Sequence, residues 1–300
     1  MKVGTFRRDG ERLVGQLDES EGHIRPFALE RIHAERGVEA LARLLDEGLP
    51  LPECGDPIAL SDITLEAPIP RPRRNVFCVG KNYYDHAEEF ASSGFDSSAA
   101  AGAVPKVPII FSKVPESVIA AGEAIVMDST VDASLDYEVE LAVIIGKGGR
   151  GITKAEALDH VWGYTIVNDV TARDLQGRHS QWLIGKSQDT FCPMGPWAVT
   201  ADEIDLSDTP VSTYVNDEKR QDSNTGLLIF DVPTIIETLS AGITLLPGDV
   251  IATGTPAGVG IGFKPPRYMV HGDRVRVEIR GIGALENPIV DRARGTQAAE

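Results

Sequence analysis

The sequence predicts a mixed α/β protein that is mostly β, with a small N-terminal α+β domain followed by a larger sandwich or barrel-like roll. Short apolar runs bounded by turn residues recur along most of the chain, which is typical of strands, whereas helical patterns are few. A proline-rich segment at residues 67–72 cannot be helical, because proline excludes helix at its own position and disfavours it at the preceding one. We therefore expect one domain over residues 1–70 and a second over residues 71–300.

The first domain is expected to begin with short strands. These strands extend to about residue 30 and turn at Asp9-Gly10 and Glu21-Gly22. An amphipathic pattern over residues 38–48 then predicts a helix that ends at Gly48, because glycine readily takes the left-handed backbone conformation after a helix. Together these elements make the small α+β unit.

The second domain is expected to consist of strands joined by turns and a few short helices. The strands are predicted at residues 76–79, 107–111, 141–145, 164–167, 197–200, 250–252 and 274–279. One helix is predicted over residues 153–158, where Thr153 and Glu156 have the spacing of a capping box, and another over residues 232–239. Residues 91–105 are small and polar, so we predict a long loop that serves as a lid, with an inert insertion as the alternative.

Composition limits the partners of the chain. The formal net charge of -16 excludes nucleic acid and an anionic membrane surface as expected partners, because both bind basic patches. Cys54, Cys78 and Cys192 are widely spaced without a C-x-x-C pair, which argues against a disulfide framework or a zinc cluster. The N-terminal residues lack an apolar signal core, and no apolar run approaches the ~20 residues of a membrane span. We therefore expect a cytoplasmic protein.

Four acids in or beside apolar runs predict a metal site. Asp136, Glu138 and Glu140 alternate along one run, so on a strand they share a face, and Asp169 ends a second run. Carboxylates gathered in a protein interior bind protons or a cation, because burial and mutual repulsion both oppose ionisation. An all-oxygen set favours magnesium, manganese or calcium over zinc. The alternative for Asp169 is that it caps the following turn.

A histidine and a lysine offer further chemistry. His86 and Glu89 lie three residues apart, so on a helical turn they can form a hydrogen bond that prepares the histidine as a general base. The alternative is a solvated helix face. Lys186 stands in an apolar setting and needs a partner, which is a substrate carboxylate, a developing enolate or one of the site acids. A structural ion pair is the alternative.

A glycine-rich stretch at residues 246–260 surrounds a short strand and allows a ligand to approach the backbone closely. Thr253 offers a hydroxyl there, although such stretches are also ordinary turns. The stretch has neither a P-loop nor a dinucleotide-binding pattern, and the chain has no G-x-S-x-G elbow. Nucleotide binding and the usual serine hydrolase chemistry are therefore not expected.

Taken in order, these segments resemble the motifs of the fumarylacetoacetate hydrolase family over roughly residues 71–288. The motifs are GKNY at residues 80–83 with His86 and Glu89, LDYEVEL at 135–141, NDVTARD at 168–174, Trp182 with KS at 186–187, and TGTP at 253–256. The resemblance implies a β-roll catalytic domain of that family's type, a homodimer, and a magnesium or manganese ion. It assigns the ion to Glu138, Glu140 and Asp169, with Asp136 beside the site but not a ligand.

The resemblance also implies roles for the other residues. His86 and Glu89 would be a dyad on the lid that activates water, and Lys186 would stabilise an oxyanion. The expected substrate-binding residues are Arg173, Gln176, Thr253 and Tyr83.

The resemblance implies a 2-oxo acid substrate and a metal that stabilises an enolate. The leading prediction is a hydrolase that cleaves a C–C bond in 2,4-dioxo acids, acylpyruvates such as fumarylpyruvate, in aromatic catabolism. The alternatives are an isomerase or decarboxylase of 2-hydroxyhepta-2,4-diene-1,7-dioate or 5-carboxymethyl-2-hydroxymuconate, keto–enol isomerisation, and oxaloacetate decarboxylation, all of which use the same enolate. A structural metal-binding module without turnover is the non-enzyme alternative, which the dyad and Lys186 argue against.

Overall fold

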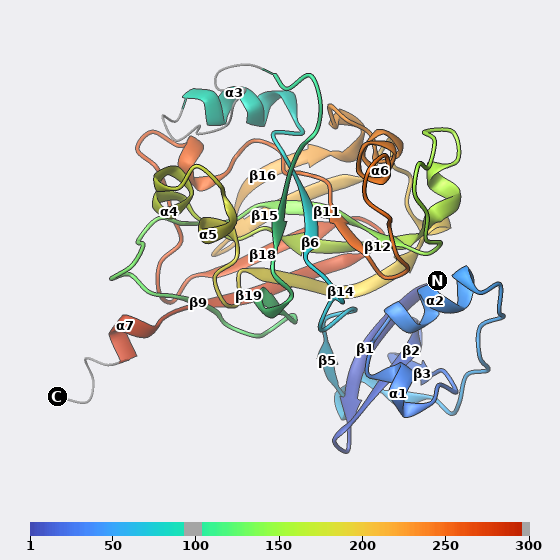
Figure 1. Ribbon diagram of the computed structural model, residues 1–300. Helices are drawn as coiled ribbons and strands as arrows, with labels where there is room; N and C mark the ends of the chain where they lie inside the picture. Colours follow the sequence, from blue (N-terminus) through green and yellow to red (C-terminus); the bar gives the residue numbers. More distant parts are fainter. Residues whose placement is uncertain (93–103, 296–300) are drawn as a thin grey trace.

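The computed structural model describes residues 1–92 and 104–295. Strands dominate it, which confirms the prediction of a mostly β protein, and Figure 1 shows the N-terminal unit beside the larger β body. The predicted lid loop at residues 91–105 falls mostly outside the described residues. Among the described helices, none is both long and apolar enough to cross a membrane.

The largest sheet runs through both parts of the chain. Its strands, in spatial order, are β4 (Ile58–Ala59), β3 (His23–Pro26), β2 (Glu11–Asp18), β1 (Lys2–Arg8), β14 (Cys192–Thr200), β12 (Val161–Asn168), β11 (Val139–Ile145), β17 (Val250–Ala252), β6 (Val76–Gly80) and β7 (Ile109–Lys113), with β5 (Thr64–Glu66) beside β1 and β8 (Val118–Ile119) beside β14. The N-terminal unit joins the rest through β1, where Val3 pairs with Ala198 of β14. The proposed domain boundary is therefore crossed by a continuous sheet.

A second, smaller sheet packs against the first. Its strands are β16 (Glu218–Asn224), β15 (Pro210–Val215), β18 (Arg274–Ile279), β19 (Gly283–Asp291) and β9 (Ile125–Met127), and a separate short pair consists of β10 (Leu135–Asp136) and β13 (Thr171–Ala172). The helices are α1 (Arg31–Ala34), α2 (Glu39–Asp46), α3 (Tyr84–Ser92), α4 (Arg173–Arg178), α5 (Leu183–Lys186), α6 (Val232–Ser240) and α7 (Arg292–Gly295). Figure 1 shows α3, α4 and α5 gathered at one end of the β body.

The central strand β11 is buried along its whole length and supplies both cores. Val143 and Ile145 pack into the cluster shared with the smaller sheet and α6, whereas Ala142 and Ile144 pack into the cluster shared with the N-terminal unit. This alternation is what a strand with two covered faces requires. The site acid Glu140 therefore lies on a strand that is buried along its whole length.

Most of the predicted elements are confirmed. Strands β17 and β18 have the predicted bounds, the other predicted strands overlap observed ones, and α2 and α6 lie where helices were expected. The helix predicted over residues 153–158 is wrong, because this segment is a turn followed by the 3₁₀ helix η3 (Ala157–His160). There the Thr153 hydroxyl donates to the Glu156 carboxylate at 2.6 Å instead of capping a backbone N–H. The two residues expected to cap a helix, Thr153 and Glu156, therefore bond to each other.

Candidate metal and substrate site

The acid-rich segment is not one continuous strand. β10 ends at Asp136 and pairs with β13, whereas β11 begins at Val139 and pairs with β12. The prediction that Asp136, Glu138 and Glu140 share one face is therefore wrong for Asp136, since the alternation is interrupted between the two strands. Asp136 instead accepts hydrogen bonds from Arg173 Nε at 2.8 Å and from the backbone N–H of Gly260 at 2.6 Å.

The other three acids converge. One carboxylate oxygen from each of Glu138, Glu140 and Asp169 lies within 4.8 Å of the others, and all three residues are buried. Two backbone interactions fix this geometry: the Asp169 N–H donates to the Glu138 carbonyl at 2.9 Å, and the Glu138 N–H donates to the Asn168 side chain at 3.0 Å. Glu140 on β11, Glu138 just before β11 and Asp169 just after β12 thus present the three carboxylates together.

Buried cations surround two of these acids. Lys186 Nζ lies 2.8 Å from Glu138 and 2.7 Å from Asp169, and Arg173 Nη2 lies 2.7 Å from Glu138. Lys113, which is fully buried at the end of β7, donates to Asp169 at 2.6 Å and to the Val170 carbonyl at 3.0 Å. These side-chain contacts of Asp169 argue against the alternative in which it caps a turn.

The acids differ in their protonation. Burial favours the neutral form of Glu138, but Lys186 and Arg173 outweigh it and lower the pKa to about 2. For Glu140, burial and then the neighbouring Asp169 and Glu138 raise the pKa well above its usual value. Glu140 accepts a hydrogen bond from the Gly254 backbone N–H at 2.9 Å, and among the described residues no side-chain cation forms an ion pair with it. Glu140 is therefore the acid whose charge the protein leaves least balanced.

Lys186, the buried lysine beside Glu138 and Asp169, stays protonated. Burial lowers the pKa of Lys186, but Asp169 and Glu138 together outweigh this and raise it. Lys186 is therefore an ammonium group that donates hydrogen bonds, and it is unsuited to removing a proton.

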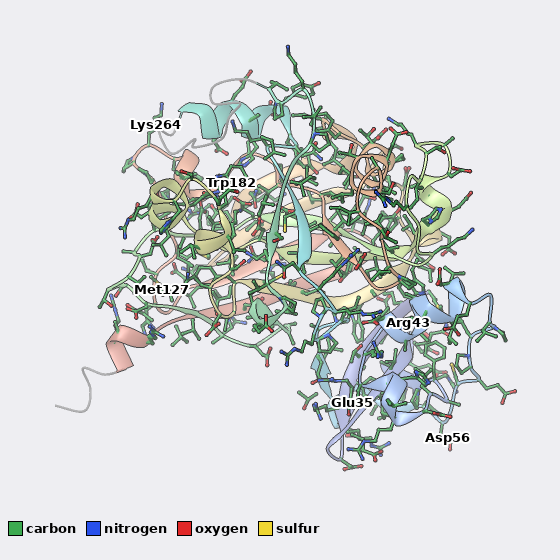
Figure 2. All side chains as sticks on the ribbon, in the orientation of Figure 1. Glu35, Arg43, Asp56, Met127, Trp182 and Lys264 are labelled. Atoms are coloured by element: carbon green, nitrogen blue, oxygen red, sulfur yellow. The ribbon has the colours of Figure 1, made fainter. Side chains whose placement is uncertain are left out.

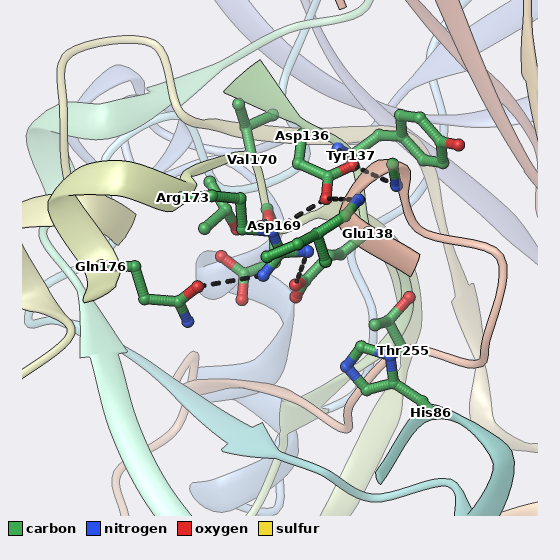
Figure 3. Close-up of polar contacts among 12 residues, drawn as sticks. His86, Asp136, Tyr137, Glu138, Asp169, Val170, Arg173, Gln176 and Thr255 are labelled. Atoms are coloured by element: carbon green, nitrogen blue, oxygen red, sulfur yellow. Dashed lines mark hydrogen bonds and ion pairs between the residues drawn. The ribbon is translucent and has the colours of Figure 1, made fainter. Parts of the chain in front are cut away.

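The predicted dyad is formed on α3. His86 Nδ1 lies 3.3 Å from Glu89 Oε2, and Glu89 also accepts from the Gly258 backbone N–H at 3.1 Å. Because a carboxylate oxygen accepts hydrogen bonds, Nδ1 of His86 is the donor in this contact. Gly262 packs so closely on Glu89 that a Cβ there would lie 1.8 Å from the carboxylate oxygen. The ring of His86 faces the acid cluster in Figure 3.

A pocket connects these groups, and its cavity volume is about 20 Å³. Its lining consists of Val79, Gly80, Lys81, His86, Phe111, Glu138, Glu140, Arg173, Gln176, Trp182, Lys186 and Thr255. The rings of Trp182 and Phe111 meet edge to face at 5.2 Å and form the apolar wall, and Trp182 lies beneath α3 in Figure 2. The pocket is therefore small, largely polar, and closed on one side by aromatic rings.

Two expected substrate residues do not line this pocket. The Thr253 hydroxyl is buried and donates to the Leu141 carbonyl at 2.9 Å. Tyr83 lines a neighbouring hollow with Leu228 and Pro256. The other expected contacts, Arg173 and Gln176, do line the pocket, and Arg173 Nη1 donates to Gln176 Oε1 at 3.1 Å.

Two residues of the site, Thr255 and Lys113, were missed by the sequence reasoning. Thr255 lies two residues beyond Thr253, and the TGTP motif that contains both residues was the available signal. Its hydroxyl accepts from Gln221 Nε2 at 2.8 Å and keeps its own proton for another acceptor. Lys113 gave no local signal, because its partner Asp169 is 56 residues away in sequence.

A family model described as the C-terminal part of fumarylacetoacetate (FAA) hydrolase matches residues 75–290 of this chain. The chain belongs to the fumarylacetoacetate hydrolase family. Members of this family are enzymes, and the acid triad of Glu138, Glu140 and Asp169 fits the divalent metal that they use. The fit rests on three buried carboxylates at ligand spacing, one of which lacks a neutralising side chain in the described structure.

Relatives within the family carry a different activity from the one predicted. The oxaloacetate tautomerase YisK of Bacillus subtilis is 50% identical over 232 residues, which cover 77% of this chain and 74% of that protein. A mitochondrial oxaloacetate tautomerase of Rattus norvegicus, Fahd2a, is 42% identical over 261 residues, or 85% and 78% of the two chains. The structure of a fumarylacetoacetate hydrolase from Exiguobacterium antarcticum aligns with a TM-score of 0.81 at 41% identity, over 97% of this chain and 100% of that one.

The prediction of an acylpyruvate C–C hydrolase is therefore wrong, since the curated relatives at 50% and 42% identity are named for oxaloacetate tautomerisation. The physical reason is that the motifs specify a metal, an enolate and a proton carrier. All of these chemistries share those components, and the motifs do not specify the step that follows enolate formation.

Proposed function

We propose that this protein is a divalent-metal-dependent tautomerase that interconverts the keto and enol forms of oxaloacetate. The observation that carries the proposal is the 50% identity to an oxaloacetate tautomerase over about three quarters of both chains. The pocket supports it, because a small cavity lined by Lys81, Arg173 and Lys186 suits a short dicarboxylate better than a long acyl chain. Tautomerisation also needs no water, and His86 and Glu138, which both line the pocket, are buried.

The substrate would be held by groups that already have fixed positions. Arg173 is oriented by Asp136 and Gln176, so its guanidinium is preorganised to bind a carboxylate. The Thr255 hydroxyl has a proton left to donate to a second carboxylate oxygen. A divalent cation on Glu138, Glu140 and Asp169 would polarise the 2-keto oxygen of the substrate.

Proton transfer is assigned to His86. Its Nε2 takes the proton from C3, the C–H electron pair becomes the C2–C3 double bond, and the imidazolium then returns this proton to the former keto oxygen, so that no atom is gained or lost. Lys186, held as an ammonium group by Asp169 and Glu138, stabilises the negative oxygen that develops. Glu89 keeps the imidazole oriented, because it is itself held by the Gly258 N–H.

The test follows the ultraviolet absorbance of the enol after enolic oxaloacetate is diluted into metal-loaded protein. We expect faster ketonisation than in buffer with metal alone, and no pyruvate release. In the His86→Ala variant, kcat should fall by about 10²–10⁴-fold while affinity for Mn²⁺ is unchanged. His160→Ala is the matched control, because His160 lies in η3 and its Nδ1 contacts the Lys147 carbonyl, outside the pocket.

Each other outcome has a distinct meaning. Metal-dependent pyruvate formation without accelerated ketonisation would replace the proposal by oxaloacetate decarboxylation. Absence of both reactions, in protein that binds Mn²⁺, would refute the proposal and leave the site as a metal-binding module.

Three further properties stay predictions. We expect magnesium or manganese as the metal because all three ligands are carboxylates, and calorimetric titration of the two ions tests this. A homodimer is expected from the family resemblance, and light scattering on the purified protein measures it. A cytoplasmic location is expected from the composition, and cell fractionation measures that.

A further inference from the structure

Asp136 is a fully buried carboxylate that the metal and proton-transfer chemistry leave without a task. Its Oδ1 accepts from the backbone N–H groups of Tyr137 at 2.9 Å and Gly260 at 2.6 Å. Its Oδ2 accepts from Arg173 Nε at 2.8 Å and from the Ile261 N–H at 3.0 Å. One side chain thus joins β10, α4 and the short helix η6 (Gly260–Gly262), as the dashed lines around Asp136 in Figure 3 indicate.

The two ends of this connection reach opposite parts of the site. Arg173 continues into the pocket, where its other nitrogens contact Glu138 and Gln176. The loop that carries η6 contacts Glu89. The Gly258 N–H of this loop donates to the Glu89 carboxylate, and Gly262 packs against it. Asp136 therefore lies between the group expected to bind substrate and the group that orients His86.

We propose that Asp136 is a positioning residue that couples Arg173 to the loop on which Glu89 rests. An ordinary structural ion pair would need only the guanidinium contact, whereas two of the four accepted bonds come from the η6 backbone. The Asp136 carboxylate accepts all four hydrogen bonds at once. An amide cannot, because its NH₂ group would face two other donors whichever way it is turned.

The proposal rests on the tautomerase activity for its kinetic test, which uses Asp136→Asn. We expect KM for oxaloacetate to rise by about tenfold through misplacement of Arg173, and kcat to fall by about tenfold through loss of the Glu89 support. In a Glu89→Gln background the kcat effect of Asp136→Asn should largely disappear while the KM effect persists. Fully additive kcat effects in the double variant would overturn the proposal, because they would mean that Asp136 does not act through Glu89.

A second readout needs neither metal nor activity. Hydrogen–deuterium exchange of the metal-free Asp136→Asn protein should show faster exchange at residues 84–90 and 258–262 than the unsubstituted protein. Asp249→Asn is the matched control, since Asp249 is also a buried carboxylate that accepts from an arginine Nε and from a backbone N–H, remote from the pocket. Unchanged exchange at residues 84–90 in the Asp136 variant would overturn the proposal.

Gly260→Ala keeps the proposal falsifiable if Asp136→Asn does not fold. A Cβ at position 260 would lie 2.7 Å from Asp136 Oδ1 and 2.6 Å from the Arg267 carbonyl, so the loop must move away from the carboxylate. The same exchange pattern is expected, and its absence contradicts the coupling. If the unsubstituted protein lacks tautomerase activity, the proposed function fails while the exchange data still decide this inference.

Discussion

The carboxylates of the pocket and those of the N-terminal unit are balanced in different ways. In the N-terminal unit, Glu66 on β5 contacts Arg7 Nε at 2.9 Å and Arg12 Nε at 2.5 Å, so two guanidinium groups surround one acid. Burial opposes its ionisation, but Arg12 and Arg7 outweigh this and lower the pKa of Glu66. In the pocket, Glu140 has two acids beside it, and its pKa is raised.

The difference separates a structural cluster from a functional one. The protein completes the charge balance of Glu66 with its own side chains, whereas at Glu140 the balance is left for a cation to complete. An acid whose burial is not compensated destabilises the metal-free fold, so a cation bound there would stabilise the protein.

The largest expected effect comes from removing a cation from the pocket. Lys186→Met leaves Glu138 and Asp169 short of a partner, and the free energy of unfolding of the metal-free protein should fall by about 3–5 kcal/mol. Saturating Mg²⁺ should recover part of this loss, because the ion supplies positive charge at the same carboxylates. Urea unfolding with and without Mg²⁺ measures both. Lys154→Met, at an exposed pair with Asp231, is the control; equal losses in both variants would remove the contrast.

Removing the unbalanced acid should separate binding from stability. Glu140→Gln should weaken Mn²⁺ binding by at least about 100-fold and abolish activity at ordinary metal concentrations. The metal-free variant should be no less stable than the unsubstituted protein, because glutamine carries neither the charge nor the extra proton that a buried acid beside Glu138 and Asp169 must hold. Calorimetric titration and urea unfolding test the two statements, and clear destabilisation of the metal-free variant would show that Glu140 is structural.

The pH dependence of stability should have opposite signs in the two clusters. The raised pKa of Glu140 means that the folded chain keeps a proton there after the unfolded chain has lost it, so stability falls as pH rises above the ordinary value of 4.5 and levels off once Glu140 ionises. The lowered pKa of Glu66 means that stability rises with pH up to 4.5 and is lost as pH falls through the folded value. Urea unfolding of chelator-treated protein against pH should show the decline above 4.5 vanish in Glu140→Gln; a persistent decline would contradict the assignment.

The smallest effect is expected in the structural cluster. Glu66→Gln should lower the free energy of unfolding by about 1–2 kcal/mol, because hydrogen bonds to Arg7 and Arg12 lose their charge. Activity and metal affinity should not change, since Glu66 lies in the N-terminal unit. Thermal unfolding and an activity assay check this, and a change in metal affinity would break the distinction between the clusters.

Local patterns predicted those parts of the fold and site that depend on neighbouring residues. The strand at residues 250–252 has its predicted bounds because Gly248 and Gly254, both at positive φ, lie on either side of it. The dyad of His86 and Glu89 needed only helical spacing. The alternation through Asp136 failed because the chain leaves one sheet and enters another at residues 137–138, which pairing between distant strands determines. The role of Lys113 could not be predicted from the sequence for the same reason, because tertiary packing alone brings it to Asp169.

The pairing of β1 with β14 has a consequence for the order in which this molecule is completed. Strand β1 is synthesised before its partner, since its register places Val3 opposite Ala198, which lies 195 residues later in the chain. Strand β1 therefore pairs late, and until then the β14 edge stays open to pairing with other chains. The N-terminal unit thus covers an exposed sheet edge, and its arrival ends the period in which the nascent β body is prone to aggregate.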